Sequence, residues 1–145
     1  MGYLNSQQTD ELLNEPIISM ITTLRADGSP HTTPVWHLVD GDEIVVAVGR
    51  NTVKTRNVGR NPSVSLCVVE GSLTRTASDP PQRWVLVNGT ARISEDRVEE
   101  LVRAVSYHYL GEEDGVPYVE DILGKLDFVL LRIRPTSVVA FDGLE

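Results

Sequence analysis

The stretch IISMITTLRADGSPHTTPVWHLVDGDEIVVAV, residues 17–48, contains the strongest indications of the fold. It is rich in β-branched residues, which favour strands, and turn residues interrupt it twice. Asp27-Gly28 is a pair typical of tight hairpin turns, and Asp40-Gly41-Asp42 marks a second turn. We therefore predict an antiparallel meander with strands at residues 17–24, 31–39 and 43–48.

Further secondary structure follows from the rest of the chain. Thr9, followed by two acidic residues, has the character of a helix start, and this helix must end near Pro16. Residues 52–60 fit a short helix with Asn51 or Thr52 as its cap. Ser94 begins an amphipathic helix, whose apolar face is formed by Val98, Leu101, Val102, Val105 and Tyr109. Additional strands are predicted at residues 63–69, 84–93, 128–133 and 137–141.

Two segments are predicted to be loops. Residues 70–82 are polar and contain consecutive prolines, which cannot continue a strand ladder. Residues 110–124 contain three glycines, a proline and five acidic residues, so we expect a loop with one helical turn. Short strands separated by regular turns predict a mainly β fold with few helices: an antiparallel barrel of six to seven strands, closed or nearly closed. We expect residues 1–145 to form a single domain.

The composition excludes several classes of protein. With 41% hydrophobic residues, the chain of 145 residues can bury one continuous core. It has no apolar run of about 18 residues and no signal-like N-terminus, so we expect a cytoplasmic protein. Its net charge of −8 opposes binding to nucleic acid and to anionic membranes. Cys67 is the only cysteine, which excludes an intramolecular disulfide, and its apolar neighbours predict a buried strand position.

Residues 49–57, GRNTVKTRN, concentrate positive charge in an acidic chain. Arg50, Lys54 and Arg56 lie around the start of the predicted short helix, where Lys54 shares a helix face with Asn57. Free backbone amides at a helix start attract anions, and a nearby lysine or arginine adds charge-assisted hydrogen bonds to phosphate. The segment therefore indicates a site for an anionic ligand. The alternative, a solvated helix whose basic residues balance nearby carboxylates, remains open at this point.

Residues 32–37, TTPVWH, form a second candidate segment. Proline lacks a backbone N–H, so Pro34 fits a strand only at an edge or a bulge, where neighbouring backbone groups are free to meet a ligand. Trp36 offers a flat surface beside that position, although packing in the core is the ordinary role of tryptophan. Both interpretations of Trp36 remain open.

No catalytic motif accompanies these segments. The chain has no G-x-S-x-G, H-E-x-x-H, Walker or G-x-G-x-x-G sequence and no convincing pair of catalytic acids. His31 and His37 share a strand face, but six residues at about 3.3 Å each separate them too far to bind one metal ion. We therefore predict no metal site and expect a bound cofactor to supply any catalytic chemistry.

Together these segments resemble the flavin- and deazaflavin-binding split barrels related to pyridoxamine 5′-phosphate oxidase. The resemblance covers nearly the whole chain and rests on ADGSPHTTPVW at residues 26–36, VGRNTVKTRNVGRNPSVSLCVV at 48–69, VLVNGTARI at 85–93 and LLRIRPTSVVAFDG at 130–143. Its most specific part is K-T-R-N at 54–57 followed by R-N-P-S-V-S-L at 60–66, which is similar to the subgroup that uses coenzyme F420. This coenzyme is a deazaflavin with a phosphate and a polyglutamate tail.

The resemblance implies a homodimeric split barrel with the tricyclic ring of the cofactor against the second and third strands, near the subunit interface. The residues that it implies for the ring are Thr33, Pro34, Val35 and Trp36, and those for the phosphate are Arg50, Lys54, Thr55 and Asn57. Thr52 occupies a position where many relatives have arginine, and its hydroxyl can also donate to phosphate. Trp84 and residues 107–109 would cap the site from the partner subunit.

The function implied by the resemblance is hydride transfer from the reduced deazaflavin to an unsaturated carbon or imine of a small apolar substrate. The protein would bind and orient the reactants and exclude water. Two alternatives remain open: an FMN-dependent oxidoreductase on the same barrel, and a non-catalytic protein that stores or carries a cofactor. The expected partners are a small-molecule substrate and a second copy of the chain.

Overall fold

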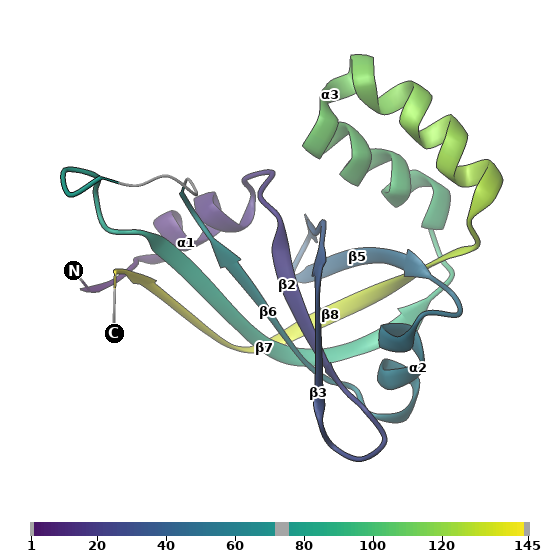
Figure 1. Ribbon diagram of the computed structural model, residues 1–145, viewed down its shortest axis with the longest axis horizontal. Helices are drawn as coiled ribbons and strands as arrows, with labels where there is room; N and C mark the ends of the chain where they lie inside the picture. Colours follow the sequence, from purple (N-terminus) through teal and green to yellow (C-terminus); the bar gives the residue numbers. More distant parts are fainter. Residues whose placement is uncertain (1, 72–75, 144–145) are drawn as a thin grey trace.

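The computed structural model describes residues 2–71 and 76–143 (Figure 1). In that part of the chain the strands are β1 (Gly2–Tyr3), β2 (Ser19–Leu24), β3 (Pro30–Val35), β4 (Leu38–Asp40), β5 (Glu43–Gly49), β6 (Ser63–Val69), β7 (Arg83–Ser94) and β8 (Phe128–Asp142). The helices there are α1 (Ser6–Leu13), α2 (Val53–Arg60) and α3 (Val98–Lys125). None of these helices is long and apolar enough to cross a membrane.

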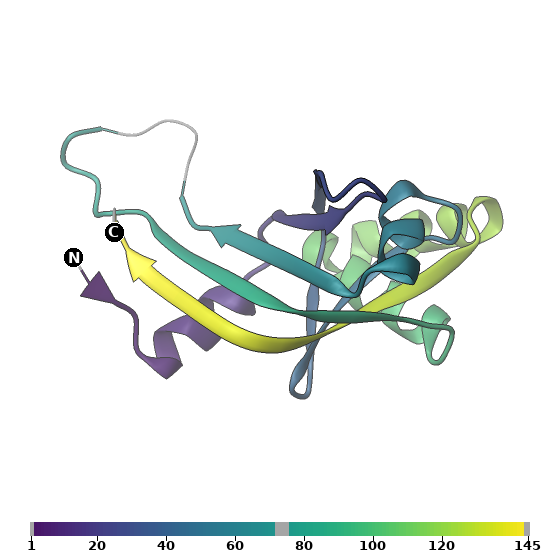
Figure 2. The ribbon, with the colours of Figure 1, turned by 90° about the horizontal axis from the view of Figure 1, so that it is seen from below.

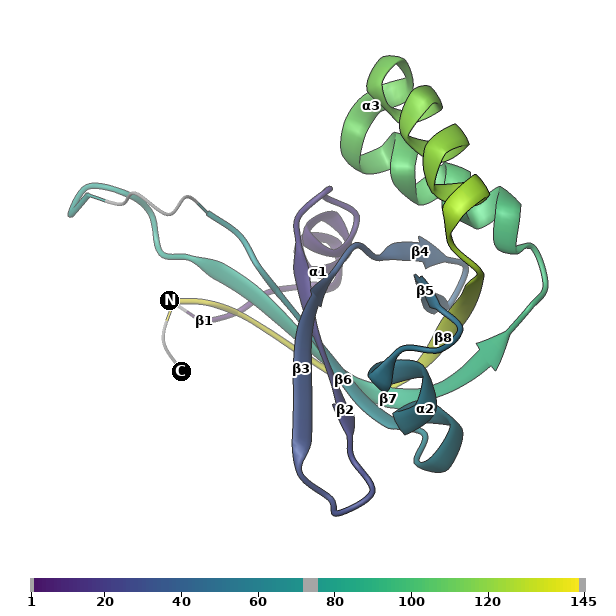
Figure 3. The same ribbon diagram turned by 45° about the vertical axis from the view of Figure 1, so that its right-hand side comes forward.

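The strands form one antiparallel sheet that curls without closing. Its order is β3-β2-β6-β7-β8-β5-β4, and the short β1 pairs with the end of β8. β3 and β4 are the two edges of the sheet, and within residues 2–71 and 76–143 they do not pair with each other. Figure 3 shows the curl, with β3 standing across from β5 and α2. The mainly β fold is therefore confirmed, in the form of a split barrel whose sheet is open.

The hairpin between β2 and β3 forms as its sequence predicts. Gly28 adopts φ = +85°, a conformation that glycine reaches without steric cost, and the Asp27 side chain accepts a hydrogen bond from the Ser29 N–H at 2.9 Å. The Arg25 N–H donates to the Ser29 carbonyl at 2.9 Å and closes the loop. These contacts fix the register in which Ile21 lies opposite Thr33.

The prediction of a single strand over residues 31–39 is wrong. β3 ends at Val35, and the chain starts β4 at Leu38, which pairs with Val45 of β5. Between the two strands the fully buried His37 turns inward, where its Nε2 lies 2.7 Å from the Leu13 carbonyl oxygen. This non-local contact breaks the strand, and the sequence of the segment gives no sign of it.

The prediction of two strands at the C-terminal end is also wrong, because β8 runs unbroken through Pro135. The register of β7 against β8 shifts between Asn88 and Gly89, so that Pro135 lies opposite Gly89 at an irregularity. A Cβ atom at Gly89 would lie 2.4 Å from the Arg134 carbonyl oxygen, so the close approach of the two strands requires glycine here. The bulge accommodates the missing N–H of the proline without ending the strand.

The ends of α1 and α3 differ from those predicted. Asn5, rather than Thr9, caps α1: its side chain accepts from the Gln8 N–H at 2.8 Å, while the Gln8 side chain accepts from the Asn5 N–H at 3.0 Å. This reciprocal capping box satisfies two backbone donors that a later start would leave free. In α3, Ser94 still belongs to β7, and the helix begins at Val98.

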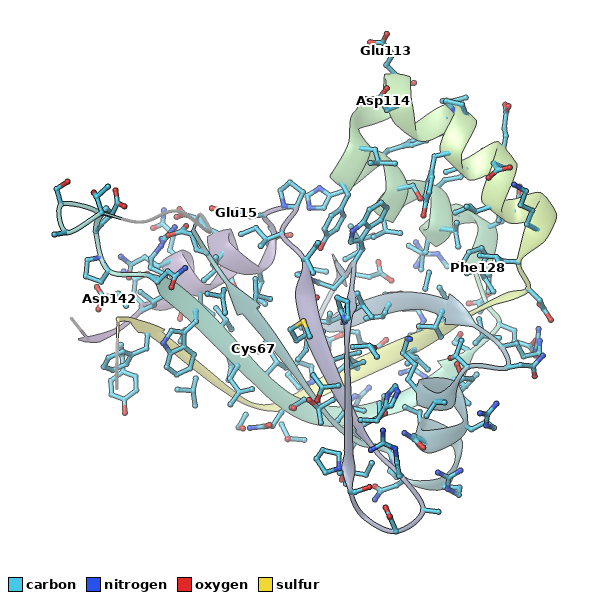
Figure 4. The ribbon with its side chains drawn as sticks, in the orientation of Figure 1. Glu15, Cys67, Glu113, Asp114, Phe128 and Asp142 are labelled. Atoms are coloured by element: carbon cyan, nitrogen blue, oxygen red, sulfur yellow. The ribbon has the colours of Figure 1, made fainter. Side chains whose placement is uncertain are left out.

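The predicted loop over residues 110–124 is helical. Gly111, with φ = +79°, breaks α3 into two helical segments that lie side by side as a helical hairpin (Figure 1). A Cβ atom on the buried Gly115 would lie 2.6 Å from the Tyr107 ring, so glycine lets the segments approach. Val116 and Val119 give the second segment an apolar face, and Glu113 and Asp114 point away at the far tip (Figure 4).

The core fills the inside of the curl. Its larger cluster joins inward side chains of β2, β5, β6, β7 and β8 with Leu12 of α1 and Val58 of α2. A smaller cluster, which includes Leu101 and Leu130, attaches the first segment of α3 to the outer face of β5 and β8. Cys67, predicted to be buried, is only half-buried, because it points to the outer face of β6 (Figure 4).

Of the predicted loop 70–82, residues 72–75 lie outside the described residues, and the described part contains no helix or strand. Figure 2 shows the ribbon from below, where residues 76–82 extend beyond the start of β7, at the end of the molecule that also holds the two termini. The opposite end of the molecule carries α2 and α3. The predicted cofactor residues 33–36 lie at the end of β3 and just beyond it, and residues 50–57 lead into and form the first part of α2.

Candidate cofactor-binding site

The predicted short helix α2 forms, and Thr52 is its cap. The Thr52 hydroxyl accepts from the Thr55 N–H at 3.4 Å and lies 2.8 Å from the Thr55 hydroxyl. Both hydroxyls also donate to the Gly49 carbonyl, at 3.1 and 2.7 Å. Thr52 and Thr55 therefore hold together the connection between β5 and α2, rather than projecting toward a ligand.

Asn57 fixes α2 to the sheet. Its side chain is 1% exposed, donates to the Thr23 hydroxyl of β2 at 3.0 Å, and accepts from the Arg60 guanidinium at 2.7 Å. These internal hydrogen bonds use both ends of the amide. In this structure Asn57 docks the helix that carries Lys54, and the role of phosphate ligand that the resemblance implies for it stays a prediction.

The surroundings of Lys54 leave its ammonium group free to bind an anion. Among the described residues it forms no ion pair, although the chain carries a net charge of −8. Its side chain is half-buried, and this burial lowers the pKa of the ammonium group. Burial removes part of the hydration of this ammonium group, and a bound anion would replace it with a charge-assisted hydrogen bond.

Arg50 has the opposite environment. Its guanidinium donates to Asp127 at 2.8 Å and pairs with Glu95 at 2.5 Å, and these two carboxylates raise its pKa. Arg56 is exposed and donates to the Asn51 carbonyl at 2.7 Å. Arg50 therefore balances nearby carboxylates, as one of the two interpretations of the basic segment predicted. The other interpretation, a site for an anionic ligand, applies to Lys54.

The edge strand β3 supplies the second part of the site. Along an antiparallel ladder every second pair of opposite residues is hydrogen-bonded. Arg25 and Ser29 form such a pair, so residues an even number of positions from Ser29, among them Thr33 and Val35, direct their backbone groups toward β2. Thr32 and Pro34 then direct theirs to the free edge. Pro34, which lacks an N–H, occupies a position on the edge strand, as its sequence predicts.

The side chain of Thr33 carries a buried polar atom without a partner. It lies on the inner face of β3, where Oγ1 is buried and has no hydrogen-bond partner within residues 2–71 and 76–143. The same is true of Nδ1 of His31, two residues earlier on the same face. Buried polar atoms are nearly always hydrogen-bonded, so these two atoms favour a ligand at this edge.

Trp36 extends from the end of β3 into a cluster of aromatic rings. It stacks on Tyr109 of α3 at 4.9 Å between ring centroids and 10° between ring planes, and lies 5.7 Å from Tyr118. The partner that covers one face of Trp36 therefore comes from the same chain. Trp84 lies elsewhere, near the chain termini, where its indole donates to the Gly143 carbonyl at 2.8 Å.

His37 connects this aromatic cluster to the barrel. Besides its contact with Leu13, its Nδ1 lies 2.9 Å from the Ser19 hydroxyl, and its backbone N–H donates to the Tyr109 hydroxyl at 3.1 Å. Burial lowers the pKa of this histidine. From the sequence, His37 is considered only as a possible metal ligand, and no local pattern marks it as a residue that joins α1, β2 and α3.

The described residues contain no group of three or more side chains placed to bind a metal ion. A surface cavity of about 480 Å³ lies between α1, the β4–β5 turn and β8, away from the predicted residues. Asp10, Asp42 and Glu43 line this acidic cavity. A second cavity of about 480 Å³ is lined by arginines, of which Arg92 and Arg132 are paired with Glu43 and Asp40. Neither cavity contains the predicted cofactor residues, and those that stay candidates on β3 and α2 we call the β3-edge site (Thr33, Pro34, Val35, Trp36 and Lys54).

An open antiparallel barrel in which α2 carries Lys54, without an ion pair among the described residues, and docks on the strand next to the edge strand is typical of the cofactor-binding split barrels. The family model described as "Pyridoxamine 5'-phosphate oxidase" matches residues 6–141. The chain therefore belongs to the pyridoxamine 5′-phosphate oxidase family, a family of flavin-type oxidoreductases. A comparison with curated protein sequences gives no significant match.

Solved structures with this fold include three informative neighbours. The conserved hypothetical protein Rv2991 from Mycobacterium tuberculosis is 25% identical with a TM-score of 0.76, over 96% of this chain and 85% of that one. A protein titled F420 Reductase is 24% identical with a TM-score of 0.67, over 89% and 94% of the two chains. A putative pyridoxamine 5′-phosphate oxidase from Listeria innocua is 21% identical with a TM-score of 0.63, over 92% and 95%.

Proposed function

We propose that this protein is an oxidoreductase that binds coenzyme F420 at the β3-edge site and transfers hydride from the reduced deazaflavin to a small unsaturated organic substrate. The observation that carries the proposal is Lys54, a half-buried cation without a carboxylate partner among the described residues. It lies on a helix docked against the strand next to β3. An anionic cofactor that also reaches the β3 edge would satisfy both features.

The residues of the chain would then divide the work of binding. The Lys54 ammonium would hold the anionic part of the cofactor, while backbone groups at the free edge, next to Pro34, would meet the polar rim of the ring. Trp36, backed by Tyr109, would pack against the apolar part of the ring and exclude water. The bound cofactor supplies the hydride chemistry, and the protein supplies orientation.

We also propose that two copies of the chain form a homodimer. In one row of the sheet, outward side chains of Met20, Cys67, Leu86 and Val139 lie side by side, and the next row includes Val69 and Trp84. This apolar outer face is not covered by α1, α2 or α3, and Met20 and Val69 are 41% and 44% exposed. A second copy packed there would bury apolar surface and would bring Trp84 toward the partner's site.

FMN is the second candidate cofactor, and the charge of the site supports it as well. Arg50 is held by two carboxylates and Arg56 is exposed, so Lys54 is the half-buried cation of this segment, and one such cation matches the single phosphate of FMN as well as the phosphate of F420. In that case the protein would be an FMN-dependent oxidoreductase of the same family. A carrier that binds either cofactor without turnover is a third outcome of the same test.

A paired titration separates these functions. The purified protein is titrated with F420 and with FMN at fixed ionic strength, and cofactor fluorescence is followed. We expect micromolar binding of F420 at least tenfold tighter than of FMN, about 1.4 kcal/mol, followed by oxidation of reduced F420 when a panel of unsaturated substrates is added. Tighter binding of FMN would establish the second candidate. Binding without any turnover would indicate a carrier, and binding of neither would refute a cofactor site.

A further inference from the structure

Two buried polar atoms on β3 have no hydrogen-bond partner in the described part of the chain. Nδ1 of His31 and Oγ1 of Thr33 are both buried and have no partner among the described residues. Loss of hydration without a replacing hydrogen bond costs free energy, so native proteins rarely retain such atoms unless a ligand or water meets them. Thr33 is already part of the β3-edge site, whereas His31 has had no role until now.

The two atoms belong to one surface. His31 and Thr33 are two residues apart on a strand, so they share its inner face with Cα atoms about 7 Å apart. Across the ladder, Thr33 faces Ile21, whose side chain has no polar atom, and His31 faces Thr23. The Thr23 hydroxyl already accepts a hydrogen bond from Asn57.

The position of this pair relative to Lys54 decides what it would contact. Lys54 and Asn57 lie three residues apart on α2, so they share a helix face, and Asn57 reaches Thr23 beside His31. In the other direction, the chain continues from Thr33 through Pro34 and Val35 to Trp36, beyond the end of β3. His31 therefore lies at the end of the inner face nearer to α2, and Thr33 lies between His31 and the rest of the residues that would line the ring.

The chemistry of the two atoms indicates a hydroxyl-bearing ligand. A neutral imidazole nitrogen either accepts or donates, depending on its tautomer, and a threonine hydroxyl does both. A ligand hydroxyl also does both, so it satisfies either arrangement, whereas a carbonyl or an ether oxygen can only accept. A chain of hydroxyls is thus the group that suits both atoms at once.

We infer that His31 and Thr33 bind the hydroxylated chain that connects the ring of the cofactor to its phosphate. This inference rests on the proposed function and deepens it, because it assigns a contact to the middle of the cofactor and gives His31 a role. It also explains why Nδ1 of a histidine on the inner face of β3 is buried without a hydrogen-bond partner in the described part of the chain.

Truncated cofactors test the inference. FMN is compared with riboflavin, which has the hydroxyl chain without phosphate, and with lumiflavin, which has the ring alone; F420 is compared with its phosphate-free form. The variants are Thr33→Val, which exchanges the hydroxyl for a methyl group of similar size, and His31→Leu. The matched control is Thr32→Val, because Thr32 points to the outer face and bonds Thr22 at 2.8 Å.

For each of the two variants we expect affinity for every ligand with the hydroxyl chain to fall by about fivefold to tenfold, the effect of one lost hydrogen bond. Affinity for lumiflavin should change by less than about twofold, as should all affinities of Thr32→Val. Thr33→Val should melt at the same temperature as the wild type or higher, since it removes a hydroxyl that has no partner in the free protein. A purely structural Thr33 would give a lower melting temperature instead.

Each outcome has a distinct meaning. Unchanged affinities in both variants, or an equal loss for lumiflavin, would overturn the inference while leaving the proposed function intact. If the wild type bound none of these ligands, the proposed function would fail and the inference with it. Should His31→Leu fail to fold, Thr33→Val alone decides between these outcomes.

Discussion

Replacement of Lys54 by alanine removes the one feature on which the anionic part of the proposed ligand depends. The ammonium group has no carboxylate partner among the described residues, so its loss leaves no unpaired protein charge behind. Burial lowers the pKa of Lys54, which means that the folded protein disfavours the charged form. We therefore expect the variant to be as stable as the wild type, and any effect to appear in binding.

The size of the binding effect follows from the loss of a hydrogen bond to a charged group, about 1.5–3 kcal/mol. That range corresponds to roughly a 10- to 150-fold weaker affinity for F420 or FMN. Because Lys54 is only half-buried, solvent screens part of the interaction, and the lower half of the range is the better expectation.

The assay is the fluorescence titration of Lys54→Ala at two salt concentrations, with Arg56→Ala as the matched control. Arg56 lies two residues away on the same helix, so its replacement by alanine removes the same charge. Its side chain is exposed and donates a hydrogen bond to the Asn51 carbonyl. We expect Arg56→Ala to bind with nearly the affinity of the wild type. Equal losses in the two variants would reduce the role of Lys54 to general electrostatics, and an unchanged affinity in a folded Lys54→Ala would refute the anion site.

Three other predictions concern different parts of the molecule. Arg50→Ala should weaken cofactor binding by less than about threefold in the same titration, because Asp127 and Glu95 already occupy its guanidinium; a loss as large as that of Lys54→Ala would contradict this. Burial depresses the pKa of His37 in the folded state, so its contribution to stability is complete above the unfolded pKa of about 6.5 and is lost as the pH falls through the folded value. Melting temperatures should therefore fall more steeply below about pH 6.5 for the wild type than for His37→Gln, and parallel curves would count against the assignment. Gly89→Ala should lower the free energy of unfolding in urea by more than about 2 kcal/mol, since its Cβ would meet the Arg134 carbonyl. Its control is Gly124→Ala, which has no atom near its Cβ and should stabilise α3 by up to about 1 kcal/mol.

Local chemistry made some elements predictable from the sequence. The β2–β3 hairpin depends on Gly28 and Asp27, and the start of α2 depends on Thr52, so each element follows from neighbouring residues alone. The break after Val35 could not be predicted in this way. It depends on the contact of His37 with the Leu13 carbonyl, which joins residues 24 positions apart.

The candidate site shows the same division. The concentration of positive charge at residues 49–57 led to Lys54, but the sequence cannot show that Arg50 is neutralised by Glu95 and Asp127. Nor can it show that Asn57 is used to dock its helix. His31 is considered from the sequence only as a possible metal ligand, since a buried atom without a hydrogen-bond partner becomes visible only when the neighbours of a side chain are known.

The free edge of β3 has a consequence for the solubility of the protein. An exposed strand edge can pair with another chain and so start aggregation, unless its donors and acceptors are removed. Of the edge positions, Pro30 and Pro34 have no N–H, and the Pro30 carbonyl already accepts a hydrogen bond from Arg25 at 2.7 Å. Thr32 is left as the N–H donor on this strand edge. The prolines thus make β3 a poor template for a further strand, and the barrel can stay open to a small ligand without recruiting other chains.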